Sequence, residues 1–404
     1  MVQKLTVNQS TKNTTIYLVT NFLRGCIFII PIWATFERQF LTYSQLALWS
    51  ALGLGLTMLL ELPTGALADI IGRKKSIVFG SIFLTLSSFS IALSTTSFQI
   101  IAGYLLYAIG DALISGADRA LIYDSLKETN QENKYPKIIA KQNLLYQIGL
   151  IVSTLSGGYL FIFWKPLPYV IMGVFRITSI FLSLMMSEPL LDSVKFTFKA
   201  YVTQTKAGFK ELFQNSYITK LSFFYMLVGG ITWSYQFFFN QPHAEEIGLT
   251  EIQRSWIFAL IRIINSFLII KILQFDRIIN KRRAFIFFPL LIILSFLPAL
   301  FADQALSILL MWGATLASTA RFVILDKYTN ENFTSRNRAT ALSSLNMLVS
   351  FVYLVVVGFS GIIMEIYSTR LVLSILGIIT TIVILPLSLN LQKTYLNLSP
   401  KESL

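Results

Sequence analysis

Residues 65–75 read GALADIIGRKK and lie between two long apolar runs of the chain. The residues of this stretch that carry its chemistry are Gly65, Asp69, Gly72, Arg73 and Lys74. The glycines would let two helix ends approach closely, and the aspartate can meet the positive N-terminus of a neighbouring helix. The arginine and the lysine would face lipid phosphates. The stretch therefore predicts a tight loop at a membrane surface.

The composition of the whole chain agrees with a membrane location. Of its 404 residues, 54% are hydrophobic and 13% are charged, and the mean hydropathy is +0.65. An ordinary soluble protein carries roughly 25% charged residues, so a water-soluble enzyme is excluded. Because one crossing needs roughly 20 apolar residues, the length leaves room for about twelve crossings and their loops.

Twelve apolar runs can be identified, at 15–36, 45–68, 76–94, 98–124, 138–163, 167–187, 217–240, 252–275, 284–301, 304–326, 338–364 and 370–391. The longest hydrophilic stretch separates six runs from six. We therefore predict an all-α membrane protein with twelve transmembrane helices in two six-helix halves, 1–187 and 217–404, joined by a cytoplasmic linker at 188–216. Aromatic residues alternate with lysines in the linker, which suits either a helix on the anionic inner leaflet or a solvated connection.

The distribution of lysine and arginine predicts the orientation. These cations are concentrated in the loops on the same side as the N-terminus, and the loops of the other side carry Arg38, Lys165, Arg254 and Arg370. Since cytoplasmic loops are enriched in lysine and arginine, we expect both termini in the cytoplasm and the chain in a bacterial inner membrane. The net charge of +13 then reflects topology, and no nucleic-acid partner is implied.

The fourth run holds acidic and phenolic side chains near the middle of the bilayer. Tyr104, Asp111 and Asp118 are seven residues apart and would share one helix face, with Tyr107 one turn from Asp111. A carboxyl group at that depth is costly, and it can bind and release a proton as its surroundings change. We predict that Asp111 carries the proton and that Arg24 is its nearest partner. A permanent ion pair or polar contact is the alternative.

Glu61 is the second candidate for proton coupling. It precedes Asp69 by about two helical turns and lies within the second apolar run. An acidic side chain in such a run is a functional hypothesis by default. Gating or proton transfer is one interpretation, and a structural ion pair is the other.

Cationic side chains outnumber Asp111 at depth, since Arg24, Arg176 and Arg262 all fall inside predicted spans. A cavity of this polarity would suit a substrate with an anionic or zwitterionic part. The candidate residues of the substrate cavity are Arg24, Tyr104, Tyr107, Trp233, Tyr235, Arg262 and Asn265. Structural pairing within the helical bundle is the alternative for each.

The loop at 65–75 resembles the signature GxLaDrxGrkxxl of the major facilitator superfamily. Ile77 occupies the last apolar place of the signature, and Ile70 stands where the family often has arginine. The resemblance implies a cytoplasmic gating loop and alternating access between two halves. Residues 276–283, after the eighth run, form a degenerate copy of the loop, as a repeat would require.

The fifth run resembles a pattern of the drug exporters of this superfamily, gxxxGPxxGG. Residues 149–158 have its spacing, but Ser153 and Thr154 replace the central Gly-Pro, and Leu106 stands in place of the arginine that is usual in the fourth span. The Glu61 region also looks like that of drug efflux members. More narrowly, the chain resembles the exporters that secrete peptide-nucleotide antibiotics of the microcin C type and protect their producer.

The sequence shows no apparatus for catalysis or cofactor binding. It lacks a phosphate loop, a zinc-protease motif and a serine-hydrolase motif. Cys26 is the only cysteine, and the only histidine, His243, falls in a predicted outer loop with Glu245 and Glu246, so we expect no metal site.

These observations predict a monomeric secondary transporter and not an enzyme. Its function would be export of an amphiphilic antibacterial compound, a small molecule or a peptide-type antibiotic, by proton-coupled alternating access. Export of a peptide-type antibiotic would give secretion and self-immunity. Import of an organic anion or a nutrient is the alternative.

Overall fold

The computed structural model describes residues 4–190, 198–274, 281–330, 333 and 338–398. In these ranges the chain is helical and contains no strand. Each of the twelve apolar runs coincides, in its described part, with one helix or with consecutive helices. Nine helices of the described ranges are long and apolar enough to cross a membrane. The predicted all-α membrane fold is confirmed.

The chain divides into two compact units. The first comprises residues 1–41, 52–196 and 250–259, and the second comprises residues 42–51, 197–249 and 260–404. Helices α3 and α12 each contribute their first turns to one unit and the remainder to the other. The predicted boundaries at 187 and 217 stay a prediction.

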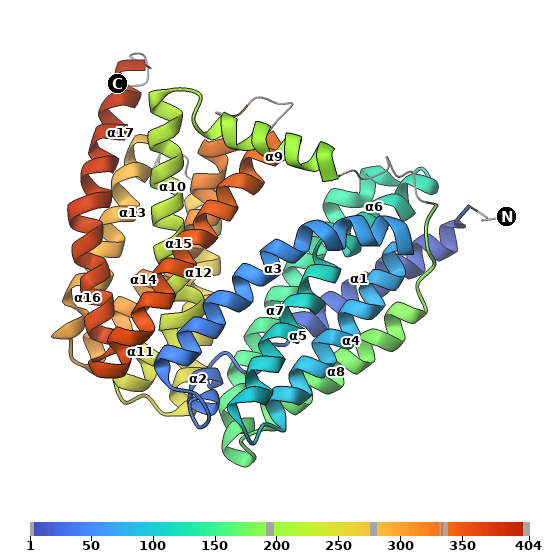
Figure 1. Cartoon of the computed structure of the whole chain (residues 1–404), viewed down its shortest axis with the longest axis horizontal. Coiled ribbons are helices and arrows are strands. Elements are labelled where there is room, and N and C mark those ends of the chain that lie inside the picture. The colour runs from blue at the N-terminus through green and yellow to red at the C-terminus, as the bar shows by residue number, and fades with distance from the viewer. Residues whose placement is uncertain (1–3, 191–197, 275–280, 331–332, 334–337, 399–404) are drawn as a thin grey trace. The chain divides into compact units, whose positions relative to one another are not determined.

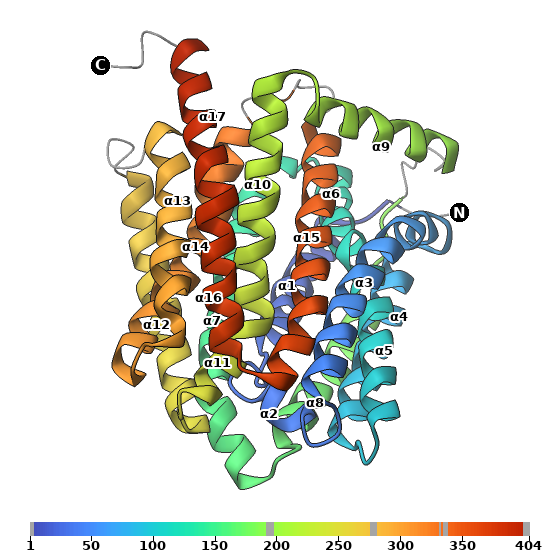
Figure 2. The same ribbon diagram turned by 60° about the vertical axis from the view of Figure 1, so that its left-hand side comes forward.

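The N-terminal helices are α1 (Val7–Gly25), α2 (Trp33–Glu37), α3 (Tyr43–Ile71), α4 (Arg73–Ala92), α5 (Ser97–Ser115), α6 (Ala117–Glu128), the short turn η1 (Glu132–Lys134), α7 (Tyr135–Phe163) and α8 (Leu167–Leu184). The C-terminal helices are α9 (Phe198–Leu212), α10 (Ser216–Ser234), η2 (Tyr235–Phe239), α11 (Asn240–Glu246), α12 (Glu251–Gln274), α13 (Lys281–Phe296), η3 (Leu297–Leu300), α14 (Gln304–Asn330), α15 (Arg338–Ile366), α16 (Thr369–Ile379), η4 (Thr380–Ile384) and α17 (Leu385–Leu398). Within the second unit, α10, α13 and α17 run side by side (Figure 1, Figure 2).

Several helices begin at sequence signals that satisfy their first backbone N–H groups. Thr6 and Gln9 form a reciprocal capping box at the start of α1, and Thr96 with Gln99 does the same for α5. The Ser368 side chain accepts a hydrogen bond from the Leu371 N–H and caps α16. Such caps satisfy donors that have no partner inside the helix.

The first apolar run is not one continuous helix, contrary to the prediction for 15–36. Helix α1 ends at Gly25, turns follow, and α2 begins only at Trp33. Pro31 lies in this interruption, and a proline has no backbone N–H with which to continue a helix. The fourth run is likewise interrupted, at Gly116, so α5 and α6 are separate helices.

Helices α4 and α5 pack closely in the first unit, as both ribbon views show (Figure 1, Figure 2). Gly80 and Gly110 face each other across this contact. A Cβ atom at Gly110 would lie 2.8 Å from the Gly80 carbonyl oxygen and 2.9 Å from the Leu84 backbone nitrogen. Because both neighbours are backbone atoms, a side chain at this position would push the two helices apart.

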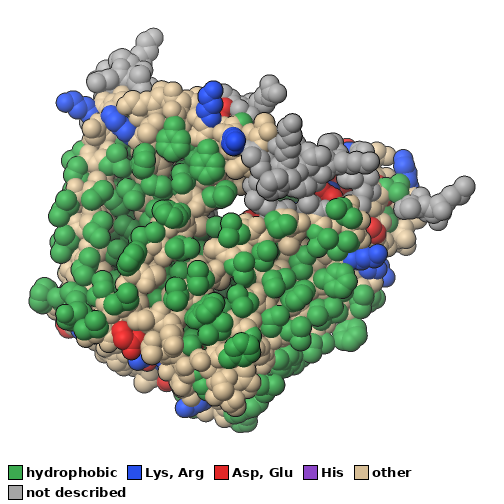
Figure 3. Space-filling model, in the orientation of Figure 1, with side chains coloured by type: hydrophobic (Ala, Val, Ile, Leu, Met, Phe, Trp, Pro, Cys, Tyr) green, Lys and Arg blue, Asp and Glu red, His purple; other side chains and the backbone are tan. Residues whose placement is uncertain are grey.

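Large apolar side chains remain exposed along the helices of both units. Phe98 and Phe163 in the first unit are 75% and 85% exposed, and Phe267 and Phe359 in the second are 67% and 68% exposed. Figure 3 shows hydrophobic side chains over the visible helix surfaces and charged side chains mostly near their ends. Exposed apolar surface of this extent is typical of a protein that contacts lipid.

We expect Gly110→Ala to destabilise the protein, because its new methyl group would meet the α4 backbone. Overpacking of this kind costs about 1–3 kcal/mol, which should lower the thermal unfolding midpoint measured in detergent. Gly358→Ala is the matched control, since a Cβ atom at Gly358 meets nothing within 4 Å. Equal midpoints for the two variants would contradict the close packing of α4 on α5.

Candidate functional site

The predicted gating loop contains a sharp reversal between α3 and α4. Gly72 has a φ of +103°, a conformation that side-chain-bearing residues rarely adopt. The Glu188 carboxylate accepts hydrogen bonds from the Arg73 and Lys74 backbone N–H groups at 2.7 and 2.8 Å. An anion at this place satisfies the first donors of α4 and interacts favourably with its helix dipole.

Two further carboxylates hold the Arg73 side chain. Its guanidinium forms an ion pair with Asp124 of α6 and lies 3.9 Å from the Asp69 carboxylate. The loop is thus tied to α6 through Arg73 and to the chain after α8 through Glu188. Asp69 and Arg73 were predicted from the sequence, whereas Glu188, which is 115 residues away from Arg73, was missed.

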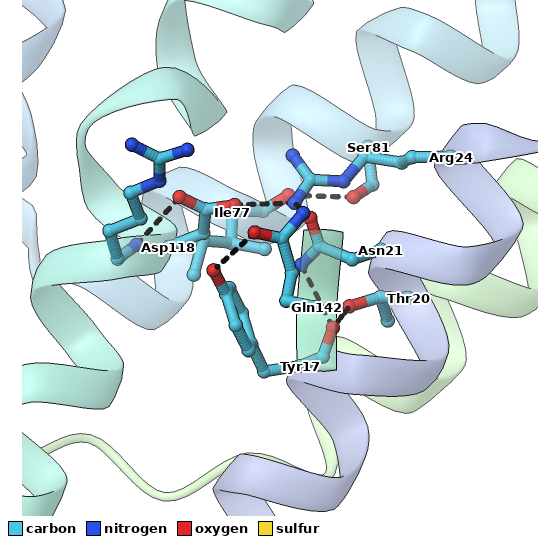
Figure 4. Close-up of polar contacts among 9 residues, drawn as sticks. Tyr17, Thr20, Asn21, Arg24, Ile77, Ser81, Asp118 and Gln142 are labelled. Atoms are coloured by element: carbon cyan, nitrogen blue, oxygen red, sulfur yellow. Dashed lines mark hydrogen bonds and ion pairs between the residues drawn. The ribbon is translucent and has the colours of Figure 1, made fainter. Parts of the chain in front are cut away.

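A second polar cluster lies among α1, α4, α6 and α7 of the first unit (Figure 4). The Arg24 guanidinium forms an ion pair with Asp118 and donates a hydrogen bond to the Asn21 side-chain oxygen at 2.8 Å. The Asp118 carboxylate also accepts from the Arg119 backbone N–H at 2.6 Å. In the same cluster, the Tyr17 hydroxyl lies 3.5 Å from Gln142 Oε1.

A cavity of about 10 Å³ borders this ion pair. Its polar lining includes Arg24, Asp118, Ser81, Thr20 and Ser183. Ser183 Oγ is buried and has no hydrogen-bond partner among the described atoms. The volume suits about one water molecule, which needs two to four polar partners.

The predicted pairing of Arg24 with Asp111 is wrong, because Arg24 binds Asp118 instead. Asp111 is half-buried, and within the described part of the chain it takes part in no hydrogen bond or ion pair. The charges that act on it from nearby are Arg24, Arg176, Glu61 and Asp118. Asp111 therefore has no hydrogen-bond or ion-pair partner in the described structure, but charged groups of both signs lie near it.

Arg176 of α8 is held by its own contacts close to Asp111. Its guanidinium donates to the Leu84 carbonyl oxygen at 2.8 Å and to the Ser88 hydroxyl, and it lies 5.8 Å from the centre of the Tyr107 ring. Tyr107 is 42% exposed. Tyr104, one further turn along α5, donates from its hydroxyl to Glu37 Oε2 at 2.7 Å. Tyr104, Asp111 and Asp118, which were predicted to share one helix face, thus each have different neighbours.

Glu61 is exposed on α3 and accepts a hydrogen bond from the Ser115 hydroxyl at 2.9 Å. Ser115 is the last residue of α5, the helix that carries Asp111. Glu61 and Asp111 therefore belong to one electrostatic group on α3 and α5. Their roles in proton coupling stay predictions.

The glycines of the exporter-like pattern serve helix packing. Cβ atoms at Gly149 and Gly157 would lie 2.7 and 2.1 Å from the Phe22 and Phe28 carbonyl oxygens. Helix α7 thus approaches the α1 segment through these two positions. This contact explains the spacing of the pattern without assigning it a transport role.

The C-terminal candidates are mostly buried in the second unit. Tyr235 is 1% exposed and packs on Phe296 with ring centres 5.4 Å apart, and the Asn265 oxygen accepts from the Trp312 indole N–H at 2.9 Å. Both side chains are enclosed in the helical core of the second unit, and their place in a substrate cavity stays a prediction. Arg262 and Trp233 are half-buried.

A buried cation that the cavity prediction did not include lies beside Trp233. The Arg321 guanidinium is 5.5 Å from the Trp233 ring centre and 5.2 Å from the Tyr225 ring centre. Aromatic faces attract cations and stabilise them in apolar surroundings. The degenerate repeat at 276–283 has described backbone only from residue 281 and otherwise lies outside the described residues.

His243 is buried in α11, past the end of the seventh predicted span. Its Nδ1 lies 3.3 Å from the Tyr235 hydroxyl, and Nε2 has no hydrogen-bond partner in the described structure. Burial, helped by the positive charge of Arg370, lowers the pKa of His243 to about 3. No group of three or more metal-ligating side chains occurs among the described residues.

We expect Asp118→Asn to destabilise the protein by about 3 kcal/mol, because it would leave the Arg24 charge buried without its counterion. A double-mutant cycle with Arg24→Gln measures this pair directly by thermal unfolding. The double variant should be more stable than the sum of the two single losses predicts, by at least about 1 kcal/mol. Strict additivity would mean that the ion pair contributes nothing.

The pKa of His243 is about 3 in the folded protein and about 6.5 in the unfolded chain. Between these two pH values the unfolded chain binds one proton more at His243 than the folded protein does. Stability should therefore fall as pH drops from about 6.5 toward 3, by roughly 1.4 kcal/mol for each pH unit. Thermal unfolding across this range in wild type and His243→Gln gives the measurement. Parallel pH profiles for the two proteins would refute the assignment.

Comparison with known proteins places the chain in a family. It matches the model of the Major Facilitator Superfamily over residues 14–332. It is 24% identical over 254 residues to an uncharacterized transporter of Buchnera aphidicola subsp. Schizaphis graminum (strain Sg), over 60% of each chain. It is 29% identical over 145 residues to the inner membrane transport protein YajR of Escherichia coli (strain K12), over 35% of this chain and 32% of YajR. Both matches span less than two thirds of the relative.

Solved structures share the fold at low sequence identity. The nucleoside transporter NupG superposes with a TM-score of 0.76 at 15% identity, over 96% of this chain and 99% of NupG. A D-xylose-proton symporter superposes with a TM-score of 0.70 at 12% identity, over 93% of this chain and 97% of the symporter. The family model over residues 14–332 shows that the chain belongs to the major facilitator superfamily, a family of membrane transporters and not of enzymes.

Proposed function

We propose that this transporter exports an amphiphilic antibacterial compound by proton-coupled alternating access. The observation that supports proton coupling best is Asp111, a half-buried carboxyl group with no direct partner in the described structure. We further propose a monomer in the bacterial inner membrane with both termini in the cytoplasm, since the loops on the N-terminal side hold most of the lysine and arginine.

In this proposal Asp111 binds a proton when water reaches it from one side and releases the proton when water reaches it from the other. The neighbouring cations Arg24 and Arg176 favour release, because they stabilise the charged carboxylate. Each is held by its own contacts, to Asp118 and to Leu84 and Ser88. Asp111 can therefore change its charge without losing a direct ion pair.

The loop at 65–75 is proposed as the cytoplasmic gate. Its hydrogen bonds to Glu188 and the ion pair of Arg73 with Asp124 hold one arrangement of α3, α4 and α6. Breaking these contacts would allow a second arrangement. Substrate and proton would bias the balance between the two, as differential binding to two states requires.

The charge of the cargo follows from which arginines are already neutralised. Arg24 is paired with Asp118, and Arg176 is bonded to a carbonyl and a hydroxyl. The charge of Arg24 is thus offset by Asp118, whereas the charge of Arg176 has only neutral acceptors. We therefore propose an amphiphilic cargo with an anionic or zwitterionic part, and a peptide-type antibiotic with self-immunity as its narrower form.

Import of a nutrient is the second candidate. NupG and the D-xylose-proton symporter, which share the fold, transport a nucleoside and a sugar according to their names. The replacements at Ser153, Thr154 and Leu106 also depart from the exporter patterns. These observations favour import, whereas the loop at 65–75 and the Glu61 region favour export.

Transport into inverted membrane vesicles with an acidic interior tests the proposal. We expect wild-type vesicles to accumulate at least one probe from a panel of labelled antibacterial compounds that includes ethidium. One proton moving down 100 mV supplies about 2.3 kcal/mol, so loss of its coupling in Asp111→Asn should lower accumulation about 50-fold. Exchange without a gradient should persist in the variant.

The matched control is Asp303→Asn. Asp303 is exposed, and its side chain caps α14 by accepting from the Leu306 N–H at 2.8 Å, which asparagine can also do. If Asp111→Asn vesicles accumulate the probe under the pH gradient as well as wild type does, Asp111 is not the proton carrier. Accumulation of uridine or xylose by right-side-out vesicles, with no antibacterial probe moved, would replace export with import.

A further inference from the structure

Glu37 is a buried carboxyl group that the proposed mechanism does not use. It is the last residue of α2 and is 3% exposed. Each carboxylate oxygen accepts one tyrosine hydroxyl at 2.7 Å, Oε2 from Tyr104 of α5 and Oε1 from Tyr169 of α8. Tyr104 is a predicted residue of the substrate cavity, whereas no pattern in the sequence indicates Glu37.

No cation forms an ion pair with Glu37 in the described structure. The helices packed on α2 contribute apolar side chains there, namely Ile91 and Ala92 of α4, Phe161 of α7 and the Tyr169 ring of α8. The titratable groups facing the carboxylate are Tyr104 and Tyr169. Two cations close in sequence or in contact with α2 are directed elsewhere, since Arg38 is exposed and Arg254 bonds to Thr35 and Glu251.

A carboxylate in such a place is poised between its two protonation states. Glu37 lies one residue beyond the first apolar run and outside the nine span helices of the described ranges. Burial raises the pKa of Glu37 to about 7, while the hydrogen bonds from Tyr104 and Tyr169 act in the opposite direction. Burial disfavours the charged form, and donors to that form favour it.

We propose that Glu37, clamped between the hydroxyl groups of Tyr104 and Tyr169, is a second proton-binding site of this protein. The ligand is a single proton taken from water, and no bond other than the carboxyl O–H is made. The site is distinct from Asp111, because the two lie on different elements. Tyr104 precedes Asp111 on α5 by two turns, or about 10 Å.

The two tyrosines differ in a way that points to the oxygen that receives the proton. Tyr169 is 1% exposed and packed on Phe36, whereas Tyr104 is half-buried. A protonated carboxyl oxygen must donate to its tyrosine, so that tyrosine has to turn its own proton elsewhere. Tyr104 has access to do so and Tyr169 does not, which assigns the proton to Oε2.

The position of the site along the chain bears on its use. Glu37 lies just before α3, and the gating loop follows the other end of that 29-residue helix, about 43 Å away at 1.5 Å for each residue. Proton binding at Glu37 therefore occurs at the opposite end of α3 from the gate. Its use in coupling rests on the proposed function, whereas the binding itself does not.

Infrared titration of the purified full-length protein between about pH 5 and 9 tests the proposal, because a protonated buried carboxyl group has its own C=O absorption. We expect a band that disappears with a midpoint near neutral pH and that is absent from Glu37→Gln. Asp303→Asn is the control and should keep the band. Asp111→Asn should also keep it, so failure of the transport test would not affect this result.

Tyr169→Phe supplies a second measurement should Glu37→Gln fail to fold. Tyr169→Phe removes one hydrogen-bond donor to the charged carboxylate, so it should raise the midpoint by about one pH unit. Tyr104→Phe removes the other donor and should raise the midpoint as well. A wild-type spectrum without a titrating carboxyl band in this range would overturn the proposal. A band that persists when Glu37→Gln and Asp111→Asn are combined, or that does not move in Tyr169→Phe, would do the same.

Discussion

A membrane interior offers no water to satisfy a charge or a backbone hydrogen bond, and this constraint accounts for most of what the structure shows. The described ranges form helices joined by short turns, and the arginines enclosed in the first unit find partners within it. Arg24 pairs with Asp118, Arg73 with Asp124, and Arg254 with Glu251. Where no counterion is available, the solution is a set of neutral donors or acceptors, as at Arg176 and Glu37.

Two carboxyl groups of the first unit, Asp111 and Glu37, have no ion-pair partner in the described structure. Asp111 has neighbouring charges but no direct partner in the described structure, and Glu37 has hydroxyl donors but no cation there. Both can gain or lose a proton without breaking an ion pair. A transporter that used both would bind protons at two depths of the same unit.

The fold could be predicted from the sequence because hydropathy is a local property that short windows record. The runs predicted from it coincide with helices, and the loop at 65–75 could be recognised from glycine, acid and base at fixed spacing. The interruption after Gly25 was missed, since Pro31 lies in a run that is apolar throughout. Periodicity also joined Tyr104, Asp111 and Asp118 into one face, although a break at Gly116 places Asp118 on α6, a different helix from the other two.

The candidate site was harder to predict because its contacts join distant parts of the chain. The acid that Arg24 binds is 94 residues away, and a seven-residue spacing on one helix cannot indicate it. Glu37 gave no signal, because an acid at the edge of an apolar run is expected to face water. Only the two tyrosine hydroxyls, 67 and 132 residues away, reveal that it is enclosed.

Glu188 has a structural consequence of its own. It is the first residue of the stretch predicted as the linker, and its carboxylate closes the first turn of α4. Tension or shortening in the connecting segment would thus be felt at the reversal around Gly72. The peptide predicted to join the halves is, at this one residue, also a structural part of the proposed gate.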